Sequence, residues 1–437
     1  MEERKSSSLR VFIILAFLLQ GLYMALLVLR NWNQHIPVFL GIYLAAFLLY
    51  GIAVKFTLNN RFGSIPRTSL LIFVSAVVFR LTVFWCLPTL SEDFYRYVWD
   101  GRAQVAGFHP YDYPPNAPEV KSLQDEIFPK LNHKEIRTPY PATAQNVFHL
   151  LAALSGNIFV FKFGILCFDF LLIEVLRRLL HKEKLSASLL LIYAWHTLPI
   201  VEFAGSTHLD IIGISLLMTA YLMIQNLRRS AAGAILGTAV MAKFLPIFAV
   251  PWMIRRGGVR FVLFLVMAAS LLFLQFYTRD LRMLDGVHFY YSKARFNDSL
   301  FGLLYHWLGD AEPARRCGAV VVAISAIACL AKRFSFYRSL FIIYGTILLF
   351  SPVVHPWYVC WVIPFLAFHP NKAWLFFSGW VALGYLIRFL YPIGLWGQVL
   401  WLKLLIYLPF YCWLFWSFLH SHRSGAKKRR RLNSRCG

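Results

Sequence analysis

Long runs of apolar residues, separated by short polar or basic connections, recur from one end of this chain to the other. Many of the runs are about 17–25 residues long, which is the length of helix that crosses the hydrocarbon core of a bilayer. The pattern predicts an all-α polytopic membrane bundle of about 12–14 spans, with residues 1–437 forming one domain. The predicted spans lie near 11–30, 36–55, 69–87, 157–178, 187–204, 209–226, 260–276, 317–331, 340–354, 357–368, 373–390 and 399–419.

The stretch 231–253 does not fit this pattern of complete spans. It consists of two apolar halves, each too short to cross a bilayer, that meet at Lys243–Pro246 between basic flanks. Such a stretch is typical of broken or re-entrant helices that enter from one side and return. Whether it is re-entrant or forms two spans stays open from the sequence.

Composition supports the membrane assignment, and charge placement suggests an orientation. Hydrophobic residues make up 59% of the chain and charged residues only 15%, against about 25% charged in soluble domains. The net charge of +24 comes largely from basic residues in the short connections and in the tail 420–437. The positive-inside rule predicts that both termini are cytoplasmic in a plasma or inner membrane. Membrane lipids, not nucleic acid, are the expected partners of the basic tail.

Two long polar segments interrupt the apolar pattern, near 89–156 and 277–316. With the N-terminus inside, the third span ends outside, so both segments are expected on the non-cytoplasmic face. The first segment is longer than a simple connection, and its many prolines beyond Gly107 predict turns and extended chain. Near its end, Thr143–Leu154 predicts an amphipathic helix along the outer surface.

The beginning of the first outer loop, Ser91–Tyr113, is a dense polar stretch in a mostly apolar sequence. A helix over Asp93–Gln104 would place Asp93, Arg96 and Asp100 on one face, because residues three and four apart are neighbours on a helix. One interpretation is an ion-paired helix on a surface. The other is a carboxylate held ready in a polar site at the mouth of a membrane bundle.

Other unusual residues gather at the outer ends of predicted spans. The sequence STHLD contains His208 and Asp210, which fit a role as helix caps as well as a role in a site. The sequence SPVVHPWY ends in Trp357 and Tyr358, which also fit an interfacial aromatic belt. Ionisable residues at membrane depth usually face the bundle interior or a wet cavity, although those near span ends can extend to the interface. The candidates are Arg80, Lys162, Asp169, Glu174, Glu202, Lys243, Arg388 and Lys403, with Lys162 and Glu174 near span ends and Lys243 beside a helix break.

Six segments, in this order, resemble the motifs of polytopic GT-C glycosyltransferases, and most closely those of the polyprenyl-phosphate-mannose-dependent mannosyltransferases. The segments are SEDFYRYVWDGRAQVAGFHPYDYPP (Ser91–Pro115), YPATAQNVF (Tyr140–Phe148), GSTHLDIIGI (Gly205–Ile214), GTAVMAKFLPIFAVP (Gly237–Pro251), RFNDSLFGLL (Arg295–Leu304) and SPVVHPWYVCWVIPF (Ser351–Phe365). The resemblance implies a GT-C-like bundle that transfers a hexose, mannose in this subgroup, from a polyprenyl-phosphate donor. The acceptor would be a glycan or glycolipid on the non-cytoplasmic face, and an acidic residue of the first outer loop would be the base.

The chemistry suits these residues. A carboxylate with a pKa of about 4 is ionised at neutral pH and can take the proton of an attacking hydroxyl. We favour Asp93 as this base, with Glu92 as the alternative, because Asp93 would face Arg96 and Asp100 on a helix and because it matches the acidic position of the family that the sequence resembles. A single in-line displacement would invert the anomeric carbon. The phosphate leaving group is built into the donor, so no nucleotide cradle is needed, and we find no glycine-rich phosphate loop. No cofactor and no metal ligands are therefore assigned, and whether a metal assists stays open from the sequence.

Further roles follow from charge and position. Cations or histidines should stabilise the departing phosphate, and the candidates are Arg295 and His355, then Lys293 and Lys243. The remaining predicted substrate-binding residues are Arg96, Tyr97, Asp100, Arg102, His109, Tyr111, Tyr140, Gln145, His208, Asp210, Asn297, Trp357 and Tyr358.

A different class of function fits part of the pattern. Broken helices and charges at membrane depth also occur in transporters and in flippases of lipid-linked or small polar solutes. The large one-sided polar loop and the lack of visible internal repeats favour the enzyme.

Overall fold

The structure is a computed structural model that describes residues 2–62, 67–390 and 399–433, and within these ranges it contains helices and no β-strand. The predicted all-α fold is confirmed for these residues. A helix satisfies all its backbone hydrogen bonds internally, which is what an apolar segment needs in lipid. The α-helices are α1 (Glu2–Leu29), α2 (Ile36–Leu58), α3 (Thr68–Phe84), α4 (Asp93–Val105), α5 (Ala142–Leu154), α6 (Ile158–Lys182), α7 (Leu191–Ala194), α8 (Thr197–Pro199), α9 (Asp210–Gln225), α10 (Arg229–Val240), α11 (Val250–Gln275), α12 (Asp285–Lys293), α13 (Leu300–Leu308), α14 (Ala311–Ala331), α15 (Phe336–Phe350), α16 (Pro356–Val359), α17 (Ile363–Leu366), α18 (Lys372–Trp380), α19 (Leu386–Leu390) and α20 (Leu400–Asn433).

Six helical stretches in the described ranges are long and apolar enough to cross a membrane, or seven if the bent pair 187–194 and 197–205 counts as one span. This is fewer than the predicted 12–14 spans. Several predicted spans are too short, since α3, α9 and α15 have 17, 16 and 15 residues. A helix of 15 residues reaches about 22 Å, less than the hydrocarbon thickness of about 30 Å. The six stretches are Ser7–Leu29, Asn33–Leu58, Leu245–Gln275, Ala311–Ala331, Lys372–Leu390 and Leu400–Ser417.

The predicted helix break near Lys243–Pro246 is present. Helix α10 ends at Val240, Lys243 lies in a non-helical link, and a 3-10 turn over Leu245–Ala249 leads into α11. A second break interrupts α11 at Gly258, whose φ of 60° lies in the left-handed region that favours glycine. Lys243 therefore does not lie on a helix, and its side chain can extend into the space between the neighbouring helices.

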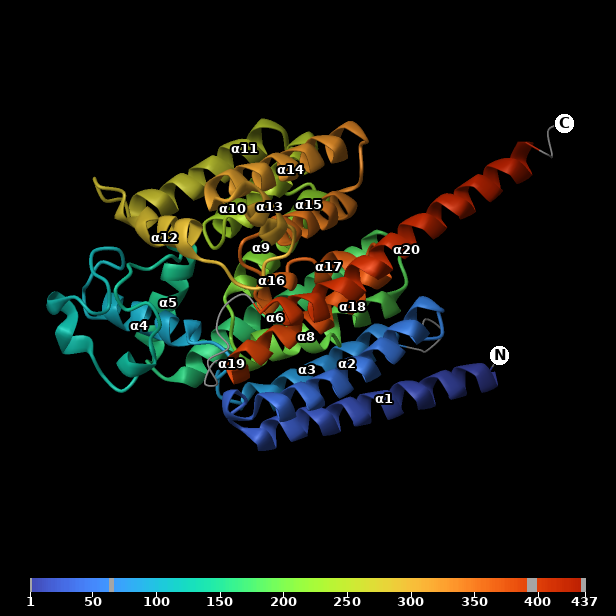
Figure 1. Ribbon diagram of the computed structural model, residues 1–437, viewed down its shortest axis with the longest axis horizontal. Helices are drawn as coiled ribbons and strands as arrows, with labels where there is room; N and C mark the ends of the chain where they lie inside the picture. The colour runs from blue at the N-terminus through green and yellow to red at the C-terminus, as the bar shows by residue number, and fades with distance from the viewer. Residues whose placement is uncertain (1, 63–66, 391–398, 434–437) are drawn as a thin grey trace.

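The helices α1, α2 and α3 run side by side along one edge of the molecule (Figure 1). The polar unit formed by α4 and α5 lies at the end of the long axis opposite to the start of α1 and the end of α20 (Figure 1). The basic tail 420–437 begins within α20, and its residues 434–437 lie outside the described ranges.

Helix α4 covers the stretch Asp93–Gln104, so the helical conformation considered for it is present, and α5 confirms the helix predicted over Thr143–Leu154. The two pack together, with the Tyr97 ring stacked on Phe148 at 4.9 Å between centroids. Most of α4 is buried, including Arg96 and Asp100, so the interpretation of α4 as an ion-paired surface helix is wrong.

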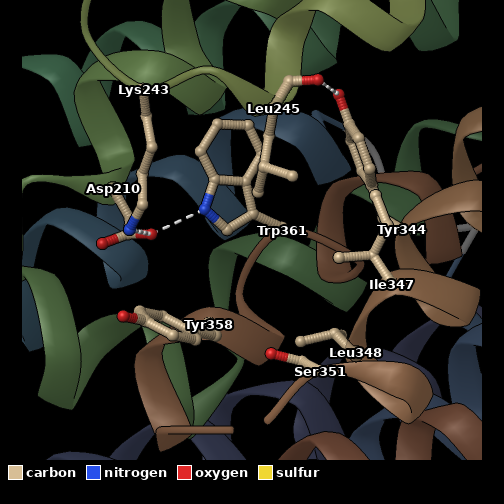
Figure 2. Close-up of a pocket in the computed structure, with 9 residues that line it drawn as sticks. All are labelled: Asp210, Lys243, Leu245, Tyr344, Ile347, Leu348, Ser351, Tyr358 and Trp361. Atoms are coloured by element: carbon tan, nitrogen blue, oxygen red, sulfur yellow. Dashed lines mark hydrogen bonds and ion pairs between the residues drawn. The ribbon is translucent and has the colours of Figure 1, made fainter. Parts of the chain in front are cut away.

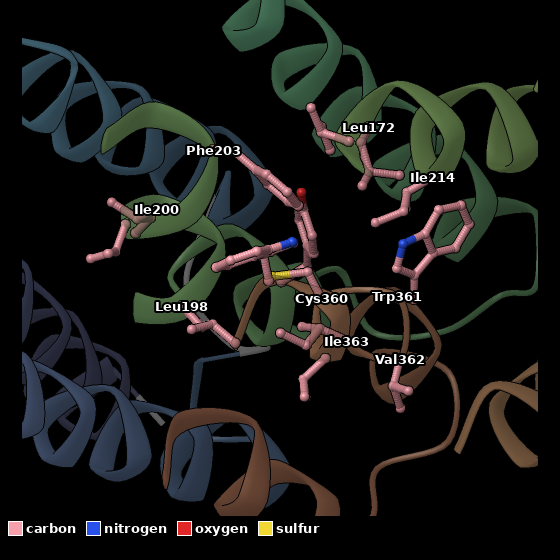
Figure 3. Close-up of a cluster of buried hydrophobic side chains, with 14 of the residues drawn as sticks. Leu172, Leu198, Ile200, Phe203, Ile214, Cys360, Trp361, Val362 and Ile363 are labelled. Carbon is pink, nitrogen blue, oxygen red and sulfur yellow. The ribbon is translucent and has the colours of Figure 1, made fainter. Parts of the chain in front are cut away.

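A buried apolar cluster fixes the elements that carry the site (Figure 3). Leu198, Ile200 and Phe203 of the bent segment are fully buried, as are Cys360 and Ile363 of the broken segment after α15. Ile200 and Phe203 belong to a π-helix over Ile200–Gly205, and such irregular turns occur frequently at functional sites. The cluster thus holds two irregular segments, far apart in sequence, against each other.

Of the ionisable residues predicted at membrane depth, Arg80, Lys162, Asp169 and Glu202 are fully buried inside the bundle, whereas the Glu174 side chain is 31% exposed. Arg80 and Asp169 form a 2.7 Å ion pair with no exposed side-chain surface, and Asp169 also accepts a 2.6 Å hydrogen bond from Tyr193. Lys162 is buried and donates to the carbonyl oxygens of Ala204 (2.9 Å) and Gly205 (2.5 Å). The expectation that Lys162 extends to the interface is wrong, because these carbonyls satisfy its ammonium group inside the protein.

Candidate functional site

Asp93 is the first residue of α4 and the first acidic group of the candidate site. Its backbone N–H donates to the Ser91 hydroxyl (3.2 Å), and its Oδ1 accepts a hydrogen bond from Asn132 Nδ2 (3.0 Å). The side chain is partly exposed. Desolvation by the surrounding protein and the adjacent charge of Glu92 raise the pKa of Asp93, against the opposing effect of the Asn132 hydrogen bond. Asp93 is thus a carboxylate that takes up a proton more readily than an ordinary aspartate.

Glu92, the neighbouring carboxylate, is held by Arg388 of α19. Arg388 Nη1 donates to Oε1 (2.8 Å) and Nη2 to Oε2 (2.5 Å), which is the two-bond fork typical of arginine and carboxylate. Burial alone would raise the pKa of Glu92, but the hydrogen bonds and charge of Arg388 outweigh it, and the pKa is lowered. The two adjacent carboxyl groups therefore have pKa values that shift in opposite directions.

A pocket of about 220 Å³ lies where the helix break after α10 meets α9, α15 and α16 (Figure 2). At its polar end Asp210 Oδ1 accepts hydrogen bonds from Trp361 Nε1 (2.6 Å) and from Lys243 Nζ. The Lys243 ammonium lies 4.6 Å from the centre of the Tyr358 ring. Apolar side chains of α15 form the other end, so the pocket is amphipathic. Its lining residues are Asp210, Lys243, Leu245, Tyr344, Ile347, Leu348, Ser351, Tyr358 and Trp361.

Asp93 and this pocket share one electrostatic environment. The positive charge of Lys243 lowers the pKa of Asp93, and the negative charge of Asp210 raises it. The interpretation of Asp210 as a helix cap is wrong, because its carboxylate accepts hydrogen bonds from Lys243 and Trp361, and α9 has no side-chain cap.

A stack of four rings stands beside the pocket. Phe296, His355, Trp357 and His208 follow one another with centroid separations of 4.5, 4.2 and 3.8 Å. His208 Nε2 lies 3.4 Å from the Glu202 carboxylate. Burial, with Lys243 and Arg388 nearby, lowers the pKa of His355 to about 3, and burial likewise lowers that of His208, so both rings are neutral near pH 7.

The stack excludes two of the alternatives drawn from the sequence. Trp357 has only 6% of its surface exposed and is sandwiched between imidazoles, so it is not part of a lipid-facing aromatic belt. His208 makes no capping hydrogen bond to α9. Backbone hydrogen bonds from Phe296 to Pro352 (2.9 Å) and from Val354 to Phe296 (2.8 Å) attach the second polar segment, 277–316, to this stack.

Several predicted substrate-binding residues form the interior of the first polar segment, 89–156. Arg96 pairs with Asp100 at 2.8 Å, and Gln145 donates to the other Asp100 oxygen at 3.0 Å. Arg96 and Asp100 expose only 4% of their side chains. This network connects α4, which begins at Asp93, to α5, and Arg96 bonds to Asp100 rather than to Asp93.

The other predicted substrate-binding residues of this loop form two groups: some pack around Tyr140, and the others make their contacts elsewhere. Tyr97 and Tyr140 meet edge to face at 5.0 Å, and the hydroxyl group of Tyr111 donates to the Tyr140 carbonyl (2.6 Å). Arg102 turns away, donating to Asp125 and to the Gly156 carbonyl (2.8 Å). His109 lies 3.6 Å from Asp112, and no contact brings it to Asp93 in the described part of the chain.

The two predicted phosphate-binding cations of the second polar segment, 277–316, differ in their contacts. Arg295 donates to Asp298 (3.0 and 2.7 Å) and lies 3.9 Å over the Tyr305 ring. Lys293 is exposed at the end of α12 and has no side-chain partner among the described residues. Asn297 donates to the Val354 carbonyl (3.3 Å), which fastens the loop.

Several residues of the site were not predicted to belong to it, among them Arg388, Asn132, Tyr344 and Trp361. Arg388 was flagged only as a charge at membrane depth, and Asn132, Tyr344 and Trp361 carried no signal. Asn132 lies in a proline-rich loop without periodicity, while Tyr344 and Trp361 resemble any aromatic residue of a span. Arg388 is identified only by its contact with Glu92, and Trp361 only by its contact with Asp210.

Comparison with known proteins identifies the family. A family model described as alpha-(1->6)-mannopyranosyltransferase, N-terminal domain, matches residues 33–256, just over half of the 437 residues. The chain matches no curated protein and no solved structure. The matched range contains Asp93, His208, Asp210 and Lys243. This match decides for the glycosyltransferase over the transporter, and the chain belongs to the alpha-(1->6)-mannopyranosyltransferase family, a family of GT-C mannosyltransferases.

Proposed function

We propose that the protein transfers mannose from polyprenyl-phosphate mannose to a hydroxyl group of a glycan or glycolipid acceptor, on the non-cytoplasmic face of the membrane. The observation that carries this proposal is the partly exposed Asp93 beside an amphipathic pocket with Lys243 at its polar end. A prenyl phosphate has the same division into an anionic head and an apolar chain. Mannosyl transfer itself follows from the family.

In the proposed reaction Asp93 is the base. The acceptor oxygen forms a bond to the anomeric carbon while its proton passes to the Asp93 carboxylate. The bond from that carbon to the phosphate oxygen breaks, and polyprenyl phosphate departs with the electron pair. One in-line displacement of this kind inverts the anomeric carbon.

The opposite pKa shifts support Asp93 over Glu92 as the base. The raised pKa of Asp93 brings its proton affinity closer to working pH, which favours general-base catalysis. The carboxylate of Glu92 already accepts two hydrogen bonds from Arg388, so proton uptake would cost that ion pair. We therefore assign Glu92 to the positioning of Arg388.

For the departing phosphate we favour Lys243 and Arg388 over Arg295. Lys243 stands at the polar end of the pocket, and the charges of Lys243 and Arg388 both act on His355. The guanidinium of Arg295 is engaged by Asp298 and Tyr305, so it would have to give up these contacts to bind phosphate. His355, a neutral imidazole, can contribute a hydrogen bond but no charge.

The orientation remains part of the proposal. The α4–α5 unit lies at one end of the molecule, and the start of α1 with the basic end of α20 lies at the other (Figure 1). The positive-inside rule then favours a non-cytoplasmic position for Asp93.

The test is transfer from labelled polyprenyl-phosphate mannose in matched membranes. Asp93→Asn should lower the transfer rate by about 10²–10⁴-fold while donor affinity changes little, because only the proton acceptor is lost. Asp125→Asn, a matched change of an exposed aspartate on the same loop, should retain wild-type activity. Full activity of Asp93→Asn would exclude it as base, and loss confined to Glu92→Gln would transfer the role.

A further inference from the structure

A second hollow, of about 310 Å³, lies at the ends of α6 and α9. Its wall combines three cationic side chains and one histidine with a single apolar residue and an amide. The lining residues are Arg177, Arg178, His181, Lys182, Leu222 and Asn226. None of them belongs to the site that contains Asp93.

This hollow lies toward the other end of α6 from the candidate active site. The first turns of α6 lie near the active site, since Lys162 donates to the carbonyls of Ala204 and Gly205, just before His208. The hollow is formed by the last turns of the same helix, from Arg177 to Lys182, which is about 22–30 Å farther along the helix axis than Lys162. It therefore belongs to the opposite membrane boundary, where lipid headgroups lie.

The arginines retain unused hydrogen-bonding capacity. Glu174 accepts from Arg177 Nε (2.6 Å) and Nη2 (2.8 Å) and from Arg178 Nε (2.6 Å), so its single charge is already balanced. Arg177 Nη1, both terminal nitrogens of Arg178 and the Lys182 ammonium have no protein partner among the described residues. One carboxylate thus faces three permanent cations, which leaves a net positive hollow.

We propose that this basic hollow binds the phosphate of an anionic phospholipid headgroup in the leaflet opposite to the candidate active site. Arginine grips phosphate oxygens with parallel hydrogen bonds, and lysine adds a point charge. Helix α6 exposes apolar residues at Phe163, Cys167 and Leu171, on the side of the helix that leads to Arg178, and this surface suits a headgroup attached to acyl chains better than a free phosphate ion. Cations at a helix end also offset the helix dipole, but that effect needs no hollow.

The experiment measures lipid binding to the purified full-length protein by native mass spectrometry, with phosphatidylglycerol against phosphatidylcholine. The wild type should retain phosphatidylglycerol selectively, and Arg178→Gln/Lys182→Gln should bind it at least about tenfold more weakly. The control is Lys332→Gln/Arg333→Gln, which removes the same charge at the start of the α14–α15 connection. That connection lies at the same end of the bundle, because Tyr337 of α15 bonds to Glu183 beside α6. The control should bind like the wild type.

A second variant keeps every charge. Asn226→Trp narrows the hollow at its exposed rim and should also weaken phosphatidylglycerol binding. Equal weakening in pocket and control variants, or wild-type binding in Asn226→Trp, would overturn the site in favour of diffuse surface charge. Complete displacement of the lipid by inorganic phosphate at equal concentration would overturn the lipid assignment in favour of a free anion. None of these readouts depends on mannosyl transfer.

Discussion

Two ion pairs within the bundle each join a cation to an aspartate distant in sequence, but they differ in their exposure to solvent. Arg80–Asp169 has no exposed side-chain surface, and the Tyr193 hydroxyl and the Ala194 carbonyl complete its hydrogen bonds. Lys243–Asp210 lies against a 220 Å³ pocket, and the Lys243 side chain is 28% exposed. A sealed pair can only contribute to structure, whereas a pair on a cavity wall can exchange its partner for a ligand.

The largest effect is expected from breaking the sealed pair. Asp169→Asn leaves Arg80 as an uncompensated buried charge, which costs about 3–5 kcal/mol when one partner of such a pair is removed. Thermal unfolding in detergent should show a large loss of stability, and activity should follow the amount of folded protein. A stable Asp169→Asn protein with impaired transfer would reverse the comparison.

Removing the cation of the open pair should affect chemistry first. Lys243→Gln should lower the transfer rate by about 10²–10³-fold, the usual cost of losing one group that stabilises transition-state charge. Asp210 keeps the hydrogen bond from Trp361 and borders the pocket, so stability should fall less than in Asp169→Asn. The measurement compares the transfer rates and melting temperatures of Lys243→Gln and Asp169→Asn in parallel. A wild-type transfer rate in Lys243→Gln would exclude Lys243 from the site.

A substitution at Arg388 tests whether the two parallel hydrogen bonds from its guanidinium group to Glu92 contribute to transfer. Arg388→Lys keeps the charge but cannot hold Glu92 with two parallel hydrogen bonds. We expect about a tenfold loss of kcat/KM, of the order of one charged hydrogen bond. Arg316→Lys, an exposed arginine that also pairs with a glutamate, is the matched control and should be silent.

The smallest change is expected from Asn132→Ala, and it should appear in the pH profile. The Asn132 hydrogen bond stabilises the ionised form of Asp93 and so lowers its pKa, which burial has already raised. Without this bond the pKa of Asp93 rises further. Because transfer needs the carboxylate, activity should be lost at higher pH on acidification than in the wild type. An unchanged acid limb would mean that Asp93 is not the group that titrates.

Apolar run lengths and the polar loop were sufficient to predict the class of the protein. If Asp93–Gln104 is helical, spacings of three and four residues place Asp93, Arg96 and Asp100 on one face, and the residue types in Ser91–Pro115 carried the resemblance that the family match supports. The structure supports six or seven candidate spans, fewer than predicted, since hydropathy does not register where helices such as α3, α9 and α15 end. The break at Pro246 was predicted, but the 49° bend between 187–194 and 197–205 was not.

Local periodicity and composition were enough to predict an all-α membrane protein, its main polar loop and the residue types available for chemistry. The pairing of the charges could not be predicted in this way. The contacts between helices show that Arg388 pairs with Glu92, Lys243 with Asp210 and Arg295 with Asp298. The physical reason is that the pKa of a carboxylate and the availability of a cation depend on neighbours within a few ångströms, which helices distant in sequence supply.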